Sequence, residues 1–475
     1  MNLRILLTSL VAIAAVPPLL SAQDKPGAAN AKPNVLFIAV DDLNHWVGYL
    51  GRNPQTKTPN LDRLAARGVA FSRAYCASPS CNPSRAALMS GMRPSTTGVY
   101  DNNNDFRPVI PADKCLPAQF RKAGYATFGA GKIYHGSYDR KDEWDDYMKT
   151  EGGYPKPKGV DGVGTIKFAP LDCTDEDIPD YKIADYTIEK LGQKHDKPFF
   201  LSCGFHKPHM PWNVPQKWFD MFPLESIQLP PHMEDDLKDV PPAGVKMARP
   251  EGDHAKILAS GRWKEAVQAY LATIAYMDMN LGRVLDALDK SPHKDNTIIV
   301  FWGDHGWHLG EKEHWRKFAL WEEATRAPLI WVAPGVTRPA VCERPVDFMS
   351  IYPTLMDLCD IETPAHVEGK SIRPLLANPR AEWAAPALTT YKFNNHAVRS
   401  EGWRYIRYAD GGEELYDESK DPLEHTNVAG NTEHAARKAE MAKAMPAKNA
   451  PDIGGAGPSR GGKRAGKGKN QAAQQ

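Results

Sequence analysis

The sequence predicts an α/β protein with a large, mostly parallel central sheet flanked by helices and a smaller C-terminal subdomain with an antiparallel sheet. Three observations support this fold class. Short apolar runs alternate with amphipathic helical stretches along most of the chain. Several of these runs are continuously apolar, which is typical of parallel strands buried on both faces. After about residue 385, the pattern changes to short strands separated by turn residues.

The elements of the large sheet follow from these apolar runs. Strands are expected at residues 34–40, 125–128, 198–205 and 297–302, with a further candidate at 328–332. Helices are expected at residues 116–122, 182–192 and 263–290. Thr58 should cap a short helix that opens at Pro59. Residues 347–360 predict a helix kinked or started near Pro353, whereas residues 139–178, rich in Gly, Pro and charge, predict irregular surface structure.

Five segments follow from changes in composition along the chain. They are a signal peptide (1–22), a flexible leader (23–33), the α/β domain (34–384), a small C-terminal α+β subdomain (385–445) and a disordered, basic, low-complexity tail (446–475). Arg4 and the apolar run that ends at Leu20-Ser21-Ala22 are typical of a secretory signal. A membrane anchor is the competing interpretation, which Pro17-Pro18 and the shortness of the run weaken. We therefore expect a periplasmic or extracellular protein without stable membrane insertion.

Charge and cysteine content narrow the possible functions. The net charge is +1, from 59 basic and 58 acidic residues, so no overall field favours nucleic acid as a partner. The seven cysteines include Cys81 and six others, which are compatible with zero to three disulfides in an exported protein. Cys76 lies close enough in sequence to pair with Cys81. No CxxC pattern or His-Cys cluster suggests structural zinc.

The segment Cys81-Asn82-Pro83-Ser84-Arg85 is expected to begin a helix. Asn82 is a good N-cap, Pro83 suits the first turn, and Gly91 can end the helix. Cys81 would then lie at a helix N-terminus, where backbone N–H groups and the helix dipole favour an anion. Arg85, one turn later, can point back at the same place. On local physics alone, a buried or disulfide-bonded cysteine on a capped helix is the simpler interpretation.

Polar groups follow four of the predicted strands. They are Asp41-Asp42, Lys132 with His135, His206, and Asp304-His305. In an α/β sheet, ligands bind beyond the carboxyl ends of the strands, so four such clusters together with Cys81 predict a functional site at that edge. The aspartates are hard oxygen ligands, suited to calcium or magnesium more than to zinc. Imidazole groups such as those of His135 and His206 are natural proton-transfer groups.

Several motifs resemble one enzyme family. Cys81-x-Pro83-Ser84-Arg85, followed by Ser90-Gly91 and Arg93, is similar to the signature of the formylglycine-dependent sulfatases of the alkaline-phosphatase-like superfamily. Further segments resemble the iduronate-2-sulfatase branch: Val40-Asp41-Asp42, residues 131–135, residues 204–209, residues 304–311 and Trp315-Arg316-Lys317. The similarity covers most of residues 34–430, with the motifs in the expected order. It implies that residues 34–384 form a sulfatase catalytic domain.

The resemblance implies a modified residue and a metal. Cys81 would be oxidised to formylglycine by a formylglycine-generating enzyme, and the hydrate of that aldehyde would be the nucleophile. One calcium ion would be bound by Asp41, Asp42, Asp304, His305 and the modified Cys81. The sequence leaves His305 open as a second-sphere or structural histidine.

The resemblance also implies roles for the other residues. Arg85 would hold the formylglycine hydrate, and Lys132 and Lys317 would bind sulfate, an anion that both ammonium groups can neutralise. His206 would protonate the departing alcohol, and His135 would help to deprotonate the hydrate. Four further residues are candidates for substrate contacts or, equally, for packing or surface positions: His209, Trp212, Trp307 and His308.

These features point to a secreted sulfatase that hydrolyses a sulfate ester on a sulfated carbohydrate or glycosaminoglycan-like glycan. The sequence does not select the sugar or the position of the sulfate. Two alternatives remain open. The same site could serve a phosphoester or phosphonate monoester hydrolase, or the protein could bind sulfated glycans without catalysis if Cys81 stays a thiol or pairs with Cys76.

Overall fold

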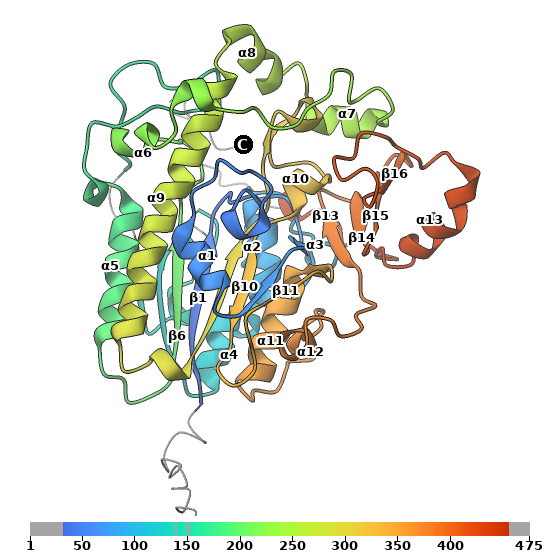
Figure 1. The fold of residues 1–475 in the computed structure, drawn as a ribbon. Helices are drawn as coiled ribbons and strands as arrows, with labels where there is room; N and C mark the ends of the chain where they lie inside the picture. Colours follow the sequence, from blue (N-terminus) through green and yellow to red (C-terminus); the bar gives the residue numbers. More distant parts are fainter. Residues whose placement is uncertain (1–31, 137, 139, 150–152, 456–475) are drawn as a thin grey trace, which may run out of the picture. The chain divides into compact units, whose positions relative to one another are not determined.

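A computed structural model describes residues 32–136, 138, 140–149 and 153–455 of the chain. At its centre lies an eight-stranded mixed sheet in the order β11-β2-β10-β7-β1-β6-β4-β5 (Figure 1). The central strand β1 (Asn34–Val40) is parallel to both of its neighbours, β6 (Phe199–Phe205) and β7 (Thr297–Gly303). Beyond β6, β4 (Ala126–Gly131) and β5 (Asp146–Met148) continue the parallel arrangement. These strands confirm the predicted parallel sheet.

The other side of the sheet is mixed. β10 (Leu329–Val332) runs antiparallel to both β7 and β2 (Val69–Phe71), and β11 (Ala340–Cys342) pairs parallel with β2 at the edge. Three of the eight strands, β2, β5 and β11, were not predicted. Each is three residues long, which is too short to show a periodic pattern, and each gains its geometry from the strand beside it.

Two hydrophobic cores cover the opposite faces of the sheet, because successive residues of a strand point to opposite sides. Residues 36, 38 and 40 of β1 pack into one core with α1 (Pro59–Ala65), α5 (Pro179–Gly192) and α9 (Trp263–Lys290). Residues 35, 37 and 39 pack into the other core with α2 (Cys81–Ser90), α4 (Leu116–Lys122) and α11 (Ile351–Leu358). The bounds observed for α4 and α9 are those predicted.

A second, four-stranded antiparallel sheet near the C-terminal end confirms the predicted subdomain sheet. Its strands are β13 (Ala387–Thr390), β14 (His396–Arg399), β15 (Trp403–Arg407) and β16 (Glu413–Asp417), and α13 (Ala435–Ala442) follows. Arg404 of β15 is buried and pairs with the carboxylates of Glu322, Glu418 and Glu424. Because Glu322 opens the short helix α10 (Glu322–Thr325), this ion cluster ties the small sheet to the α/β body.

The last described residues lie against the segment that follows α2. The Ala450 N–H donates to the Ser95 carbonyl over 2.7 Å, and the Tyr100 hydroxyl donates to the Ala450 carbonyl over 2.9 Å. Residues 446–455, which the sequence analysis assigned to the tail, therefore make specific contacts. The predicted signal peptide, the leader up to residue 31 and residues 456–475 lie outside the described residues. Among the helices of the described chain, none is long and apolar enough to cross a membrane.

Candidate active site

The carboxyl ends of β1, β4, β6 and β7 lie in register, so the polar residues after each strand meet. The Asp41 N–H donates to the Phe205 carbonyl over 3.1 Å, and the Asp304 N–H donates to the Val40 carbonyl over 3.0 Å. In the same way, the Lys132 N–H donates to the Gly204 carbonyl over 2.8 Å. These three bonds extend the strand ladders by one residue and fix the positions of the functional side chains.

Cys81 lies at the N-terminus of α2, as predicted, but it is the first helical residue, because the N-cap is Ser80 and not Asn82. The reason is a distant partner. The Asn102 side-chain oxygen accepts hydrogen bonds from the Ser80 hydroxyl (2.8 Å) and from the Asn82 N–H (3.0 Å), so a loop some 20 residues away caps the helix. Gly91 ends the helix with φ = 72°, as the sequence suggested.

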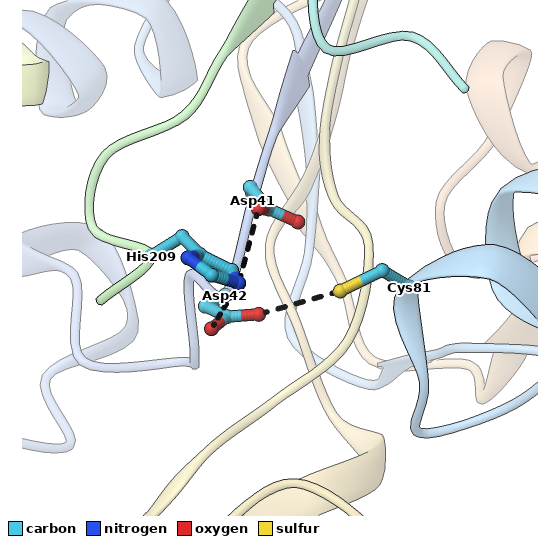
Figure 2. A group of neighbouring side chains, drawn as sticks. All are labelled: Asp41, Asp42, Cys81 and His209. Carbon is cyan, nitrogen blue, oxygen red and sulfur yellow. Dashed lines mark hydrogen bonds and ion pairs between the residues drawn. The ribbon is translucent and has the colours of Figure 1, made fainter. Parts of the chain in front are cut away.

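Carboxylates from two strand ends surround the Cys81 thiol. Figure 2 shows Asp41 and Asp42 at the end of β1, Cys81 at the start of α2, and His209 on the loop after β6, pointing toward one another. The thiol donates to Asp42 Oδ1 over 3.8 Å, and the His305 Nε2 lies 3.4 Å from the sulfur. Asp42 has φ = 58°, a left-handed conformation that is uncommon for residues other than glycine.

Three buried cations lie among the three buried aspartates Asp41, Asp42 and Asp304. Arg85 Nε donates to Asp304 Oδ2 over 2.9 Å, and its Nη2 lies 3.3 Å from Asp41 Oδ1. Lys132 Nζ pairs with the other oxygen of Asp41. Lys317 Nζ lies 2.5 Å from Asp42 Oδ1 and 2.9 Å from the sulfur of residue 81. Positive and negative groups therefore balance around residue 81.

This arrangement of charges shifts several pKa values. Burial alone would raise the pKa of Asp41, but Lys132 and its other cationic neighbours lower it well below its usual value. For Asp304, burial outweighs the nearby cations, and its pKa is raised. Burial, reinforced by Asp41, also raises the pKa of the Cys81 thiol. The thiol is therefore protonated at neutral pH and is a poor nucleophile as it stands.

A pocket of about 520 Å³ opens onto this cluster, and Lys132, Lys317 and three histidines are part of its lining. Burial and the adjacent Lys132 lower the pKa of His135 to about 2, and its Nδ1 is buried without a hydrogen-bond partner among the described residues. Burial lowers the pKa of His206, although Asp180 acts in the opposite direction. Burial likewise lowers the pKa of His209 to about 4. Neutral imidazoles thus face buried cations across the pocket.

Comparison with known proteins identifies the family. The family model described as sulfatase matches residues 33–361, which is most of the chain. The chain belongs to the sulfatase family. A second model, described as the C-terminal part of N-sulphoglucosamine sulphohydrolase, matches residues 310–450 and so spans the small sheet of this sulfatase.

Individual relatives agree with this assignment. A protein named sulfatase from Formosa agariphila is 42% identical over 451 residues, which span 88% of this chain and 87% of that protein. Iduronate 2-sulfatase of Mus musculus is 28% identical, and the match spans 84% of this chain and 91% of that protein. The fold of this sulfatase also matches the crystal structure of the phosphonate monoester hydrolase of Agrobacterium radiobacter, with a TM-score of 0.73, 23% identity, and coverage of 86% and 94% of the two chains.

The sulfatase fold implies a bound metal, and the residues of this chain fit one. Oxygen atoms of Asp41 and Asp304, His305 and the residue 81 sulfur lie within 4.8 Å of one another, and Asp41, Asp42, Cys81 and His209 form an overlapping group. The Asp42 Oδ2 atom is buried without a hydrogen-bond partner in the described structure. A buried carboxylate oxygen without a partner is costly, and a cation would satisfy it. The predominance of carboxylate oxygens matches the ligand preference of calcium.

Two predicted substrate contacts do not reach the pocket of this sulfatase. Trp212 is fully buried and packs against Tyr270 and Trp307, with ring centroids 5.2 Å and 5.8 Å away. His308 is also fully buried, and its Nδ1 lies 3.0 Å from the Glu311 carbonyl oxygen. Their interior positions go with these packing and hydrogen-bond partners, which the linear sequence does not reveal. Trp307 and His209 do line the pocket.

Cys81 and Cys76 do not form a disulfide. All seven cysteines fall within the described residues, and none of them forms a disulfide. Cys76 is buried in the core that contains α2, α4 and α11, whereas the Cys81 sulfur faces Lys317 and His305. The two side chains therefore lie in different environments, although only four residues separate them in the sequence.

Sequence reasoning missed several residues that shape the site of this sulfatase. The clearest example is Asp180 in the first turn of α5, which is fully buried. Its Oδ1 accepts the N–H groups of His206 (2.6 Å) and Lys207 (3.0 Å), and its Oδ2 accepts the Tyr154 hydroxyl (3.0 Å). An acidic residue after Pro179 signals a helix start, but its partners some 26 residues away leave no local pattern.

Proposed function

We propose that this chain is an exported sulfatase that hydrolyses a sulfate monoester on a carbohydrate and uses Cys81 in its formylglycine form. The observation that carries the proposal is the convergence of Arg85, Lys132 and Lys317 with three aspartates on residue 81. A sulfate monoester is an anion, so a nucleophile approaching its sulfur meets charge repulsion. Buried cations that are already in place offset this repulsion without reorganisation during the reaction.

Formylglycine would supply, as its hydrate, an oxygen nucleophile that the protonated Cys81 thiol cannot provide. Arg85 is held on both sides by Asp41 and Asp304, so its guanidinium is fixed one helical turn from residue 81. Lys317 Nζ, 2.9 Å from the sulfur of residue 81, is placed to bind an oxygen next to the reacting atom. Lys132 lines the same pocket and supplies a second positive charge for the sulfate oxygens.

The two pocket histidines support opposite proton transfers. His135 is neutral at physiological pH because burial lowers its pKa to about 2, and its buried Nδ1 has no hydrogen-bond partner among the described residues. Such a low pKa makes a weak base, so the negative charge of a bound sulfate would have to raise this pKa before Nδ1 takes a proton from the hydrate. His206 must instead donate a proton to the departing alcohol. Burial lowers its pKa in the free protein, and the negative charge of a bound sulfate would raise it. His206 would therefore become an acid when the substrate is present.

Asp41, Asp42, Asp304 and His305 would hold a calcium ion, whose chemistry is to supply positive charge beside the nucleophilic oxygen. Without it, the three aspartates cancel the charges of Arg85, Lys132 and Lys317. A divalent cation would leave the site with a net positive charge, which suits a sulfate ester. This charge balance supports a metal requirement for substrate binding.

The carbohydrate and the compartment rest on separate observations. The relative named iduronate 2-sulfatase acts, by its name, on a sulfated sugar acid, and its sequence matches most of this chain. Residues 1–22 resemble a secretory signal, which supports export. A formylglycine-generating enzyme would be the required partner. Phosphonate or phosphate ester hydrolysis is the second candidate, since a phosphonate monoester hydrolase shares the fold.

Two measurements test the proposal. Mass spectrometry of the peptide that contains residue 81, from protein made in its native host, should detect formylglycine; a thiol alone would contradict it. Steady-state assays with matched aryl sulfate and aryl phosphate should give the larger kcat/KM for sulfate, and a large preference for phosphate would favour the second candidate. The Cys81→Ala variant is the control for background hydrolysis in both assays.

A further inference from the structure

A second, larger cavity adjoins the catalytic pocket. It has a volume of about 920 Å³ and is lined by residues of α7 (Pro242–Ala248), α8 (Asp253–Ser260) and loops of the small C-terminal sheet. We call it the distal cavity. Arg316 and Phe318 line both the distal cavity and the catalytic pocket. Lys317, which lies between these two residues in sequence, is next to Cys81. A ligand that extends past Arg316 and Phe318 would therefore occupy both the catalytic pocket and the distal cavity.

The distal cavity carries surplus positive charge. Five basic side chains line it, against the two carboxylates of Asp253 and Asp410. Arg316 pairs with Asp253 over 2.7 Å, and Lys392 pairs with Asp101. The other three are Lys246, Arg249 and Lys256, which are exposed and form no ion pair with any described residue. Unpaired cations that share one cavity favour an anionic ligand.

The distal cavity also offers aromatic surface. The rings of Phe318 and Tyr391 lie with centroids 6.0 Å apart at an interplanar angle of 30°, and both rings line the cavity. Aromatic rings of this kind provide apolar area against which a sugar ring can stack. The volume falls at the upper end of the range for small-molecule sites, which suits an oligosaccharide segment better than a single small ion.

We propose that the distal cavity binds a second anionic sugar unit of the same glycan whose sulfate ester enters the catalytic pocket. This inference rests on the proposed sulfatase function. Lys246, Arg249 and Lys256 bind the sulfate or carboxylate groups of that unit, and Phe318 and Tyr391 contact its ring. The preferred substrate is therefore an oligosaccharide or polysaccharide that carries at least two negative charges, and not a sulfated monosaccharide.

A binding experiment tests this inference without requiring turnover. The full chain with Cys81→Ala is titrated calorimetrically with sulfated disaccharides and matching tetrasaccharides from heparin, chondroitin sulfate and carrageenan. In at least one series, the tetrasaccharide should bind at least tenfold more tightly than the disaccharide. Adding Lys246→Gln, Arg249→Gln and Lys256→Gln together should remove this gain, because three partly exposed ion pairs change affinity by roughly ten- to a hundredfold. The matched control is Lys122→Gln, an exposed lysine at the end of α4.

The outcomes separate this inference from the proposed function. Hydrolysis of a small aryl sulfate should be unchanged in the triple variant made with an intact Cys81, because none of the three side chains lines the catalytic pocket. Equal affinity for both chain lengths in every series, no binding in any series, or a length dependence that survives the triple substitution would each overturn the inference. Failure of the wild-type protein to hydrolyse aryl sulfate would instead overturn the proposed function.

Discussion

At the scale of single residues, the site places ionisable groups where burial alone would make them neutral. Lys317 and Lys132 remain charged because each lies against an aspartate, which raises the pKa of both lysines despite burial. For His135 and His206, nearby carboxylates do not offset burial, which lowers the pKa of each. In the proposed mechanism, the lysines bind the anion and the histidines transfer protons, so the two kinds of side chain can be tested separately.

The acid role of His206 predicts a dependence on the leaving group. His206→Ala should lower kcat/KM for alkyl sulfates by about 10²- to 10⁴-fold, because a poor alcohol leaving group needs a proton. The loss on an activated aryl sulfate should stay below about tenfold, since a phenolate departs without help. Parallel assays of the two substrate types check this. Equal losses on both would show that His206 is not the acid.

Glu143, which does not line the catalytic pocket, is expected to make the stability of the protein depend on pH. Burial raises its pKa from 4.5 to about 7, and the Tyr134 hydroxyl donates to its carboxylate. Its stabilising contribution is therefore complete below about pH 4.5 and is lost as the pH rises through 7. Glu143→Gln, which stays neutral, should make the protein more stable at pH 8 by about 2–3 kcal/mol, with little change at pH 4.5.

Urea unfolding of the wild type and of Glu143→Gln at both pH values measures this difference. Asp142→Asn is the matched control, because Asp142 is the exposed neighbour in the same short helix. If Glu143→Gln raises the free energy of unfolding equally at pH 4.5 and pH 8, the titration of Glu143 is not the cause of the stabilisation.

At the scale of elements, long buried elements could be predicted and short or long-range features could not. The bounds of β1 and α9 match because six consecutive apolar residues after Asn34, and a helical pattern sustained over 28 residues, are strong local signals. β5 lies in a stretch for which the sequence predicts irregular structure. Its own residues show no strand pattern, and its extended geometry comes from its pairing with β4. The N-cap of α2 and the interior position of Trp212 likewise depend on partners distant in sequence.

Helix α5 provides a test of how elements position the site. Asp180 in its first turn accepts the N–H groups of His206 and Lys207, so it fixes the start of the loop that carries the proposed acid. Asp180→Ala should reduce activity on alkyl sulfates more than on aryl sulfates, in the same direction as His206→Ala. If Asp180 acts through His206, the losses of the two variants should not add in the double variant.

The control for this cycle is Asp185→Ala. Asp185 lies on α5 like Asp180, and its substitution removes an ion pair with Arg283 of α9. It should leave both activities close to wild type. Additive losses of Asp180→Ala and His206→Ala would contradict a positioning role and would indicate a general loss of stability.

At the scale of the whole molecule, buried ion pairs connect the central sheet, helix α2 and the small C-terminal sheet. Arg404 joins the small sheet to α10 through Glu322, and Arg85 joins α2 to the ends of β1 and β7. Removing one member of such a cluster leaves uncompensated buried charge, which typically costs about 3–5 kcal/mol. The balanced charges around residue 81 also mean that the fold does not depend on a metal for neutrality.

Chelation therefore should separate activity from folding. Treatment with EDTA should abolish sulfate ester hydrolysis yet leave the far-UV circular dichroism unchanged, because Arg85, Lys132 and Lys317 already neutralise the three aspartates. Added calcium should restore activity and raise the unfolding midpoint by about a few degrees. Asp42→Asn should lose this thermal response to calcium. Unfolding on chelation, or an identical calcium response in Asp42→Asn, would contradict the ligand assignment.

The complete burial of Cys81 also sets an order of events during biosynthesis. An enzyme that has to hold the segment around Cys81 in its own active site must meet that segment before α2 packs against the sheet, because every residue of α2 is buried in the folded protein. The loop that caps α2 is in turn contacted by Ala450 and Asp452, near the end of the chain. Because those residues follow the loop by about 350 positions in the sequence, these contacts can form only after most of the described chain has been synthesised. The topology thus provides a time window in which the nascent chain can be modified.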